Sequence, residues 1–218
     1  MASGDAGEIL LIDKPYGWTS AQAVAWVRRR YKCRKAGHAG TLDPLATGLL
    51  IIGTERQTKA LSTLMDLPKV YYALIRLGYR TESDDAEFPP QRVGEPPRLS
   101  WEEWEAFLAR FRGEVWQRPP TYAALKVQGR RAYALARAGE VLELPPRPVH
   151  VHEVKLLRYD PLERLLLRIH CGKGFYVRSL ARDIGERLGC GGYLAALRRT
   201  AIGPYTVSQA IQPDASFV

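Results

Sequence analysis

The 218-residue sequence has no asparagine, only three cysteines and no long hydrophobic run. Cys33, Cys171 and Cys190 form no CxxC pair, so neither a disulfide framework nor a thiolate zinc site is predicted. No apolar stretch reaches the roughly 18 residues of a membrane-spanning helix, and the N-terminus has no signal-peptide pattern. These absences predict a cytoplasmic protein without a membrane partner.

The charge, in contrast, is strongly unbalanced. The sequence holds 32 Lys and Arg against 23 Asp and Glu, a formal net charge of +9. The basic residues cluster, several times beside a tyrosine, at 28–35, 126–131, 173–187 and 198–199. A single cluster is often only a solvated surface, but cations and aromatic rings together are what looped RNA requires. A polyanionic partner, with nucleic acid first, is therefore expected.

Apolar periodicity and turn residues predict the elements of the fold. Helices are expected at 19–32, with Thr19 or Ser20 as N-cap, and at 55–67, 100–111, 176–189 and 192–200, with a further one ending at Gly139. Strands are expected at 8–13, 49–54, 69–79, 149–159 and 164–171. Strands and helices intermingle irregularly, which predicts an α+β fold with a mixed, largely antiparallel sheet flanked by helices.

Three segments are expected to lie outside this packed core. Residues 1–7 read as a flexible leader and 213–218 as a tail, leaving one catalytic domain over 8–212. The polar, proline-rich segment 80–97 is too long for a tight turn, and it is expected to be a functional loop or a disordered insert.

His150 and His152 alternate in a predicted strand and so share one face of it. A zinc site needs three or four ligands, and no further ligand cluster accompanies this pair. No metal site is predicted.

The stretch GHAGTLDPLATGLLII, residues 37–52, contains a single carboxylate, Asp43. Read locally, Asp43 is a helix N-cap, Pro44 takes the first helical position, and Gly48 ends a single turn.

Five stretches of the sequence, taken in order, indicate a different role for Asp43: 13–20, 35–50, 69–78, 118–139 and 168–189. Together they resemble the TruB family of tRNA pseudouridine synthases, from about Ile9 to Ile211. The resemblance implies the pseudouridine synthase catalytic fold and an isomerase that acts on the T-loop uridine at tRNA position 55. The glycosidic bond breaks, the uracil turns, and C5 rejoins the ribose. It implies the T arm of tRNA as partner, no required protein partner, a monomer, and neither cofactor nor metal.

The resemblance also assigns residues. Asp43 matches the catalytic aspartate, Arg178 its partner, and Tyr71 the aromatic residue against the target base. His38 matches a histidine that enters the RNA loop, Leu197 a pocket wall, and Asp85 an RNA contact. Four more positions match as structural or phosphate-contacting residues: Lys14, Tyr122, Lys126 and Lys173.

One carboxylate is chemically sufficient for this reaction. Glycoside hydrolysis uses two, but an isomerase retains the leaving base and activates no water. A guanidinium at Arg178 would keep Asp43 ionised, and the uridine must leave its stack to reach it. Three roles of Asp43 remain open: addition to the sugar, addition to the base, or abstraction of a ribose proton.

Two alternative functions also remain open. One is a related synthase that works with guide RNA, and the other is an RNA-binding or RNA-folding protein without turnover. Family members often carry a C-terminal PUA domain that grips tRNA. Since the sequence ends at Val218, no such domain is expected.

Overall fold

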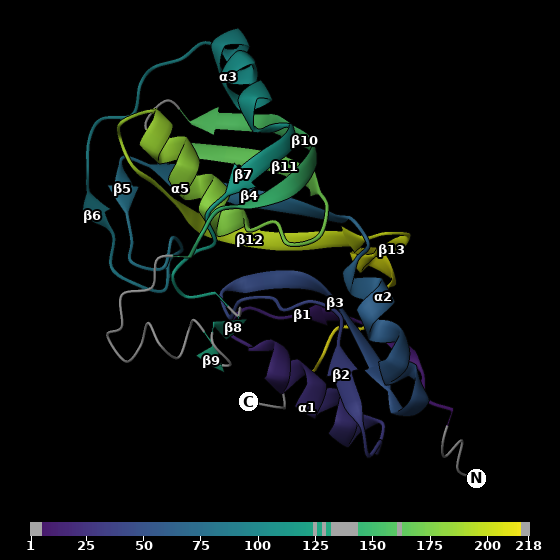
Figure 1. The fold of residues 1–218 in the computed structure, drawn as a ribbon. Coiled ribbons are helices and arrows are strands. Elements are labelled where there is room, and N and C mark those ends of the chain that lie inside the picture. Colours follow the sequence, from purple (N-terminus) through teal and green to yellow (C-terminus); the bar gives the residue numbers. More distant parts are fainter. Residues whose placement is uncertain (1–5, 124–125, 128–129, 132–143, 161–162, 215–218) are drawn as a thin grey trace. The chain divides into compact units, whose positions relative to one another are not determined.

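A computed structural model of the chain describes residues 6–123, 126–127, 130–131, 144–160 and 163–214 (Figure 1). The chain forms two compact units. Unit 1 comprises residues 1–71 and 197–218, and unit 2 comprises residues 72–196. Strands β4 (Lys69–Leu77) and β12 (Gly192–Ile202) contribute residues to both.

The sheet of unit 1 is built around β3 (Ala46–Thr54). It pairs antiparallel with β1 (Ile9–Lys14) and with β2 (Ala36–His38). It pairs parallel with β12, where Leu197 lies opposite Ala46. The short strand β13 (Tyr205–Thr206) folds back and pairs antiparallel with the end of β12, and η3 (Val207–Gln209) follows it.

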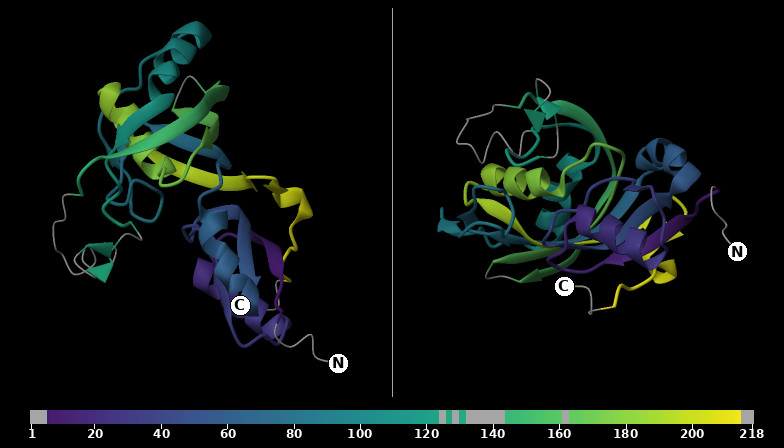
Figure 2. Two further views of the ribbon diagram at one scale, coloured as in Figure 1. Left: turned by 45° about the vertical axis from the view of Figure 1, so that its right-hand side comes forward. Right: turned by 90° about the horizontal axis from the view of Figure 1, so that it is seen from below.

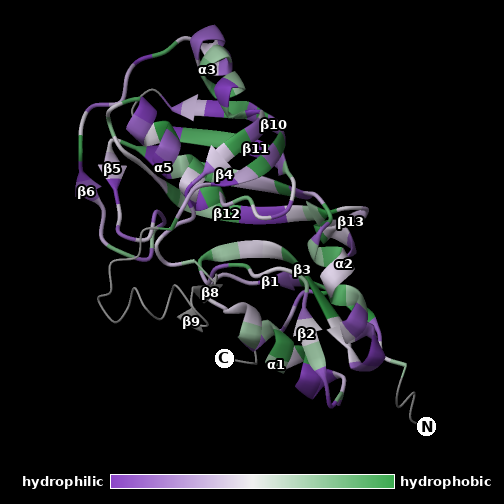
Figure 3. Ribbon diagram, viewed as in Figure 1, coloured by the Kyte–Doolittle hydropathy of each residue, from purple (hydrophilic) through white to green (hydrophobic). Residues whose placement is uncertain are grey.

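Helices cover both faces of the β1–β3 ladder because alternate residues of a strand point to opposite faces. Helix α1 (Ser20–Arg30) begins at a capping box formed by Thr19 and Gln22. Its core cluster with the ladder includes Leu10, Ile12, Trp26, Val27, Leu50 and Ile52. On the other face, η1 (Glu55–Ala60) and α2 (Leu61–Met65) follow β3, and the core there includes Leu49, Ile51, Leu61 and Ile202. Figure 3 shows these apolar stretches in green.

The sheet of unit 2 follows the order β12-β4-β11-β10-β7. Strand β10 (Arg147–Asp160) pairs antiparallel with β11 (Arg164–Cys171) and with β7 (Gly113–Gln117). Helix α5 (Val177–Arg187) lies beside this sheet (Figures 1 and 2), and Val177, Leu180 and Ile184 are buried. The remaining elements of unit 2 are α3 (Trp101–Leu108), η2 (Ala109–Phe111), β5 (Tyr79–Arg80), β6 (Gln91–Arg92), β8 (Lys126–Val127) and β9 (Arg130–Arg131).

Most expected elements are confirmed, as is the mixed, largely antiparallel sheet. The helix expected at 100–111 begins as α3, with Ser100 as N-cap and Glu103 completing a capping box. The expected helix at 55–67 begins as the 3₁₀ helix η1. The helix expected to end at Gly139 lies outside the described residues.

The helix predicted at 192–200 is wrong, because this segment is strand β12. Alanine, leucine and arginine favour helices in isolation. Here the backbone pairs with two partners far away in sequence: Leu194 N–H donates to Asp84 O at 2.9 Å, and Leu197–Arg199 pair with 46–48 of β3. Tertiary pairing therefore overrides local propensity. Among the described helices, none is long and apolar enough to cross a membrane.

Candidate active site

Asp43 lies in a tight turn that leads into β3. Ala46 N–H donates to Asp43 O at 3.0 Å, and β3 begins at Ala46. The local reading as a helix N-cap is therefore wrong, since the chain after Asp43 pairs in a sheet. Gly48 does not end a helical turn either. It lies inside β3 with φ +103, and a Cβ there would stand 2.2 Å from Arg199 O.

Lys14 ties the loop between β1 and α1 to this turn. Its side chain is fully buried. Nζ donates to Trp18 O at 2.6 Å, to Pro15 O at 3.1 Å and to Pro44 O at 3.3 Å. Burial lowers the pKa of Lys14 to about 8, and the negative charge of Asp43 opposes that shift. Of the two roles expected for Lys14, the structure supports the structural one, because a buried ammonium cannot touch a phosphate of bound RNA.

Two further buried side chains fix the backbone on either side of Asp43. Ser20 Oγ donates to Leu42 O at 3.0 Å and accepts from Leu42 N–H at 2.9 Å. Arg199 donates from Nε to Leu49 O at 2.7 Å and from Nη2 to Gly40 O at 3.1 Å. The segment that carries Asp43 is thus held by side chains from β1, α1 and β12, and Asp43 itself is half-buried.

Three other predicted site residues also belong to unit 1. His38 ends β2 opposite Ile52 of β3. Leu197 pairs with Ala46, three residues after Asp43. Tyr71 is a buried residue of β4. Strand β3 therefore brings Lys14 and Leu197 close to the Asp43 turn through its pairing with β1 and β12, while His38 pairs further along the strand.

Arg178 is the centre of the predicted set in unit 2. This buried guanidinium donates to Ser83 O and to Tyr122 O, both at 3.3 Å. Its Nε lies 3.9 Å from Asp85 Oδ2. Asp85 is buried as well, and its Oδ1 accepts from Ser83 Oγ and from Glu87 N–H. The expectation of Asp85 as an RNA contact is corrected here, because its carboxylate faces Arg178 from within the core. Asp43 belongs to unit 1, so its pairing with Arg178 stays a prediction.

One turn further along α5, Arg182 secures the same loop. It donates to Asp84 Oδ2 at 2.8 Å and to Arg118 O at 2.7 Å. Burial raises the pKa of Asp84 to about 6, and the charge of Arg182 opposes that shift. The segment 80–97, expected to be too polar to pack, is therefore partly buried, because arginines of α5 satisfy its carboxylates and carbonyls.

Two protein-family models match this chain. The model of the TruB family pseudouridylate synthase N-terminal domain matches residues 28–177, and that of the tRNA pseudouridylate synthase B C-terminal domain matches residues 178–214. The chain belongs to the TruB family.

Curated relatives of the TruB chain are named tRNA pseudouridine synthase B. One from Parasynechococcus marenigrum is 49% identical over 92% of this chain and 69% of its own length. One from Mycobacterium tuberculosis is 46% identical over 94% of this chain and 70% of its own length. One from Rhodopseudomonas palustris is 46% identical, and the chain spans only 55% of its length. Among solved structures, a Cbf5-Nop10-Gar1 complex matches with a TM-score of 0.73 and 29% identity, over 94% of this chain and 52% of that chain.

The remaining predicted residues of this TruB chain lie in unit 2. Lys173 is exposed in the turn between β11 and α5, where a phosphate contact is sterically open. The backbone carbonyl of Tyr122 accepts a hydrogen bond from Arg178, and the ring centroid of Tyr122 lies 5.2 Å from that of Phe88. Lys126 pairs with Arg131 between β8 and β9.

Sequence reasoning offered Ser20 only as a possible helix N-cap and placed Arg199 in a basic cluster expected to bind RNA. The basic cluster 198–199 is corrected accordingly: Arg199 is buried, and Arg198 pairs with Asp13 at 2.7 Å. The sequence signal for Ser20 and Arg199 was a polar residue inside an apolar segment. Local sequence patterns do not show which distant backbone groups such a residue binds.

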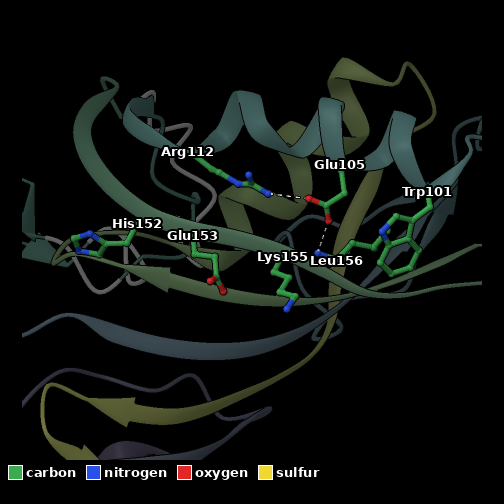
Figure 4. Close-up of a pocket in the computed structure, with 7 residues that line it drawn as sticks. All are labelled: Trp101, Glu105, Arg112, His152, Glu153, Lys155 and Leu156. Carbon is green, nitrogen blue, oxygen red and sulfur yellow. Dashed lines mark hydrogen bonds and ion pairs between the residues drawn. The ribbon is translucent and has the colours of Figure 1, made fainter.

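Two features of unit 2 lie apart from the predicted residues. His170 of β11 joins His150 and His152 in a row, with ring centroids 4.6 and 4.5 Å apart. In the described part of the chain, no group of three His, Cys, Asp or Glu residues has the geometry to hold a metal ion. A cavity of about 390 Å³ lies between α3 and β10 (Figure 4), and its lining includes Trp101, Glu105 and Arg112 but none of the TruB site residues predicted above.

Proposed function

We propose that this chain isomerises uridine to pseudouridine in the T loop of tRNA, at position 55, with Asp43 as its catalytic carboxylate. Membership of the TruB family and the names of its relatives support the reaction and the substrate class. The observation that carries the proposal is the Asp43 turn. The half-buried carboxylate of Asp43 belongs to a backbone segment that accepts hydrogen bonds from buried polar side chains of three elements. Its position is therefore fixed before the substrate binds.

Preorganisation of this kind is what catalysis by one charged group requires, because a misplacement of about 1 Å can cost a factor of about 100 in rate. The other residues take the roles expected from the family resemblance. Arg178 pairs with Asp43 and keeps it ionised, Tyr71 lies against the target base, and His38 enters the T loop. Leu197, beside the Asp43 turn, forms a wall of the uridine pocket.

Unstacking the target uridine costs a few kcal/mol, which contacts to the flipped base and its neighbours must offset. The net charge of +9 supplies long-range attraction for RNA. We infer a monomer acting on the T arm alone, without metal or cofactor.

The relatives named tRNA pseudouridine synthase B are closer in sequence than the Cbf5 structure, at 46 to 49% against 29% identity. This difference favours a stand-alone tRNA enzyme over a guide-RNA-dependent synthase. Turnover by the purified chain without guide RNA would separate the stand-alone enzyme from both alternatives, the guide-RNA-dependent synthase and the RNA-binding protein without catalysis.

The test compares an unmodified tRNA transcript with its isolated T-arm hairpin. Pseudouridine is measured by mass spectrometry after chemical derivatisation, and the control hairpin carries cytidine at the target position. If the contacts centre on the T arm, kcat/KM for the hairpin lies within about tenfold of that for tRNA, about 1.4 kcal/mol in transition-state binding. The absence of pseudouridine in both RNAs would refute the activity, and a hairpin a thousandfold worse than tRNA would refute the T-arm restriction.

A further inference from the structure

The most exposed aromatic side chain in the described part of unit 1 is Tyr16, with 67% of its surface accessible. The other tyrosines and tryptophans of unit 1, all within its described residues, are more covered: Trp18, Trp26 and Tyr71 are buried, Tyr205 is half-buried, and Tyr31 is 39% exposed. Tyr16 is not among the buried core residues of the described part of unit 1, so its exposed ring calls for another explanation.

Tyr16 lies on a loop that is fixed to the Asp43 turn. Gly17 N–H donates to Pro44 O at 2.9 Å, and Pro44 directly follows Asp43. The buried Lys14 ammonium binds the carbonyls on both sides of Tyr16, those of Pro15 and Trp18, together with that of Pro44. The backbone of Tyr16 is therefore held one residue from a direct contact with the turn that carries the proposed catalytic group.

The chain turns directly after Tyr16, because Gly17 has φ +82, a left-handed conformation that favours glycine. The hydrogen bonds of Gly17 N–H and of Lys14 Nζ hold this turn in place. A ring on a rigid loop loses little conformational freedom when it binds, so its contact area contributes to affinity efficiently. An exposed aromatic side chain on a rigid loop offers a flat face for a nucleobase, and such stacking is tolerant of base identity.

We propose that Tyr16 forms a nucleobase-binding subsite beside the active site, where its ring stacks on an unpaired base of the RNA next to the target uridine. The subsite rests on the proposed function for the identity of its ligand, an RNA loop. Its role is to hold the strand once the uridine has left its stack, so it acts on binding and not on the chemical step.

The experiment measures the dissociation constant and single-turnover rate of Tyr16 variants on a T-arm hairpin. Loss of one base–aromatic stack weakens binding roughly 5- to 100-fold. Y16A and Y16L should both show this loss, with the rate on bound RNA within about threefold of wild type, while Y16F retains affinity. The matched control is W116A, which removes a similarly exposed ring from β7 of unit 2 and should leave binding unchanged.

A second arm identifies the base. A set of hairpins is prepared, each with a single abasic nucleotide at a different position flanking the target uridine. The dissociation constant of each hairpin is measured with wild type and with Y16A. One abasic position should weaken binding to wild type by the same factor as Y16A, and cause no further loss in Y16A. Binding by Y16A and Y16L within twofold of wild type, or additive losses at every position, would overturn the subsite. Because this readout is binding, it stands even if wild type proves inactive, which would refute the proposed function alone.

Discussion

Replacing Ser20 by alanine tests how the Asp43 turn is held. The hydroxyl of Ser20 is buried and is bonded to both backbone groups of Leu42, the residue before Asp43. The substitution removes almost no volume, so the main effect is the unsatisfied N–H of Leu42. A buried polar group without a partner costs about 1 to 3 kcal/mol. For a chain of this length, about 2 kcal/mol corresponds to a fall in Tm of about 4 to 8 °C.

The same substitution should lower kcat by up to about 100-fold, because Asp43 follows the loosened residue directly. Thermal unfolding followed by circular dichroism gives Tm, and pseudouridine formation at saturating hairpin gives kcat. Ser62→Ala is the matched control, since Ser62 is exposed and its Oγ reaches Lys59 O only at 3.5 Å. A Tm and a kcat for Ser20→Ala equal to those of the control would refute the reasoning.

Two further predictions concern backbone approach and pH. Gly48→Ala should destabilise the fold by more than about 3 kcal/mol relative to Gly113→Ala. Both glycines have a positive φ, but only at Gly48 would a Cβ collide with the backbone of Arg199. Chemical denaturation measures the free energy of unfolding of both variants, and equal values would contradict the prediction. The raised pKa of Asp84, about 6, means that the folded state binds a proton more tightly than the unfolded state, so this group's stabilisation is present below pH 3.8 and is lost as pH rises through 6. The free energy of unfolding of wild type should therefore fall across this window relative to that of Asp84→Asn, and parallel pH profiles would exclude the effect.

The sequence predicts best where structure depends on neighbouring residues. Of the two N-caps offered, Thr19 starts α1, the expected start at residue 100 agrees with the Ser100 N-cap of α3, and the apolar stripe of 176–189 predicts α5. These signals act within one or two helical turns, so they do not depend on the tertiary contacts of the rest of the chain. Asp43 was identified by the resemblance of its motif, since its local pattern predicted a helix cap that the structure does not form.

What the sequence does not predict depends on partners distant along the chain. β12 replaces an expected helix because its backbone meets Asp84 and β3, more than 100 residues away. Arg199 has the composition of a surface cation, yet it is buried because carbonyls of the Asp43 segment surround it. In the same way, the carboxylates of Asp84 and Asp85 appear too polar to pack until α5 supplies arginines. Each case pairs groups that only the completed fold brings together.

The most direct test of the central claim is the single-turnover rate of pseudouridine formation by Asp43→Asn, measured with the dissociation constant for the same T-arm hairpin. The amide keeps the size of the carboxylate and removes its charge, and Asp66→Asn provides a control at an exposed aspartate of the same unit. If Asp43 is the catalytic group, the rate falls by at least about 1,000-fold, roughly 4 kcal/mol in the barrier, while the dissociation constant stays within about threefold of wild type. A rate within tenfold of wild type, with RNA bound equally well, would contradict the catalytic role of Asp43.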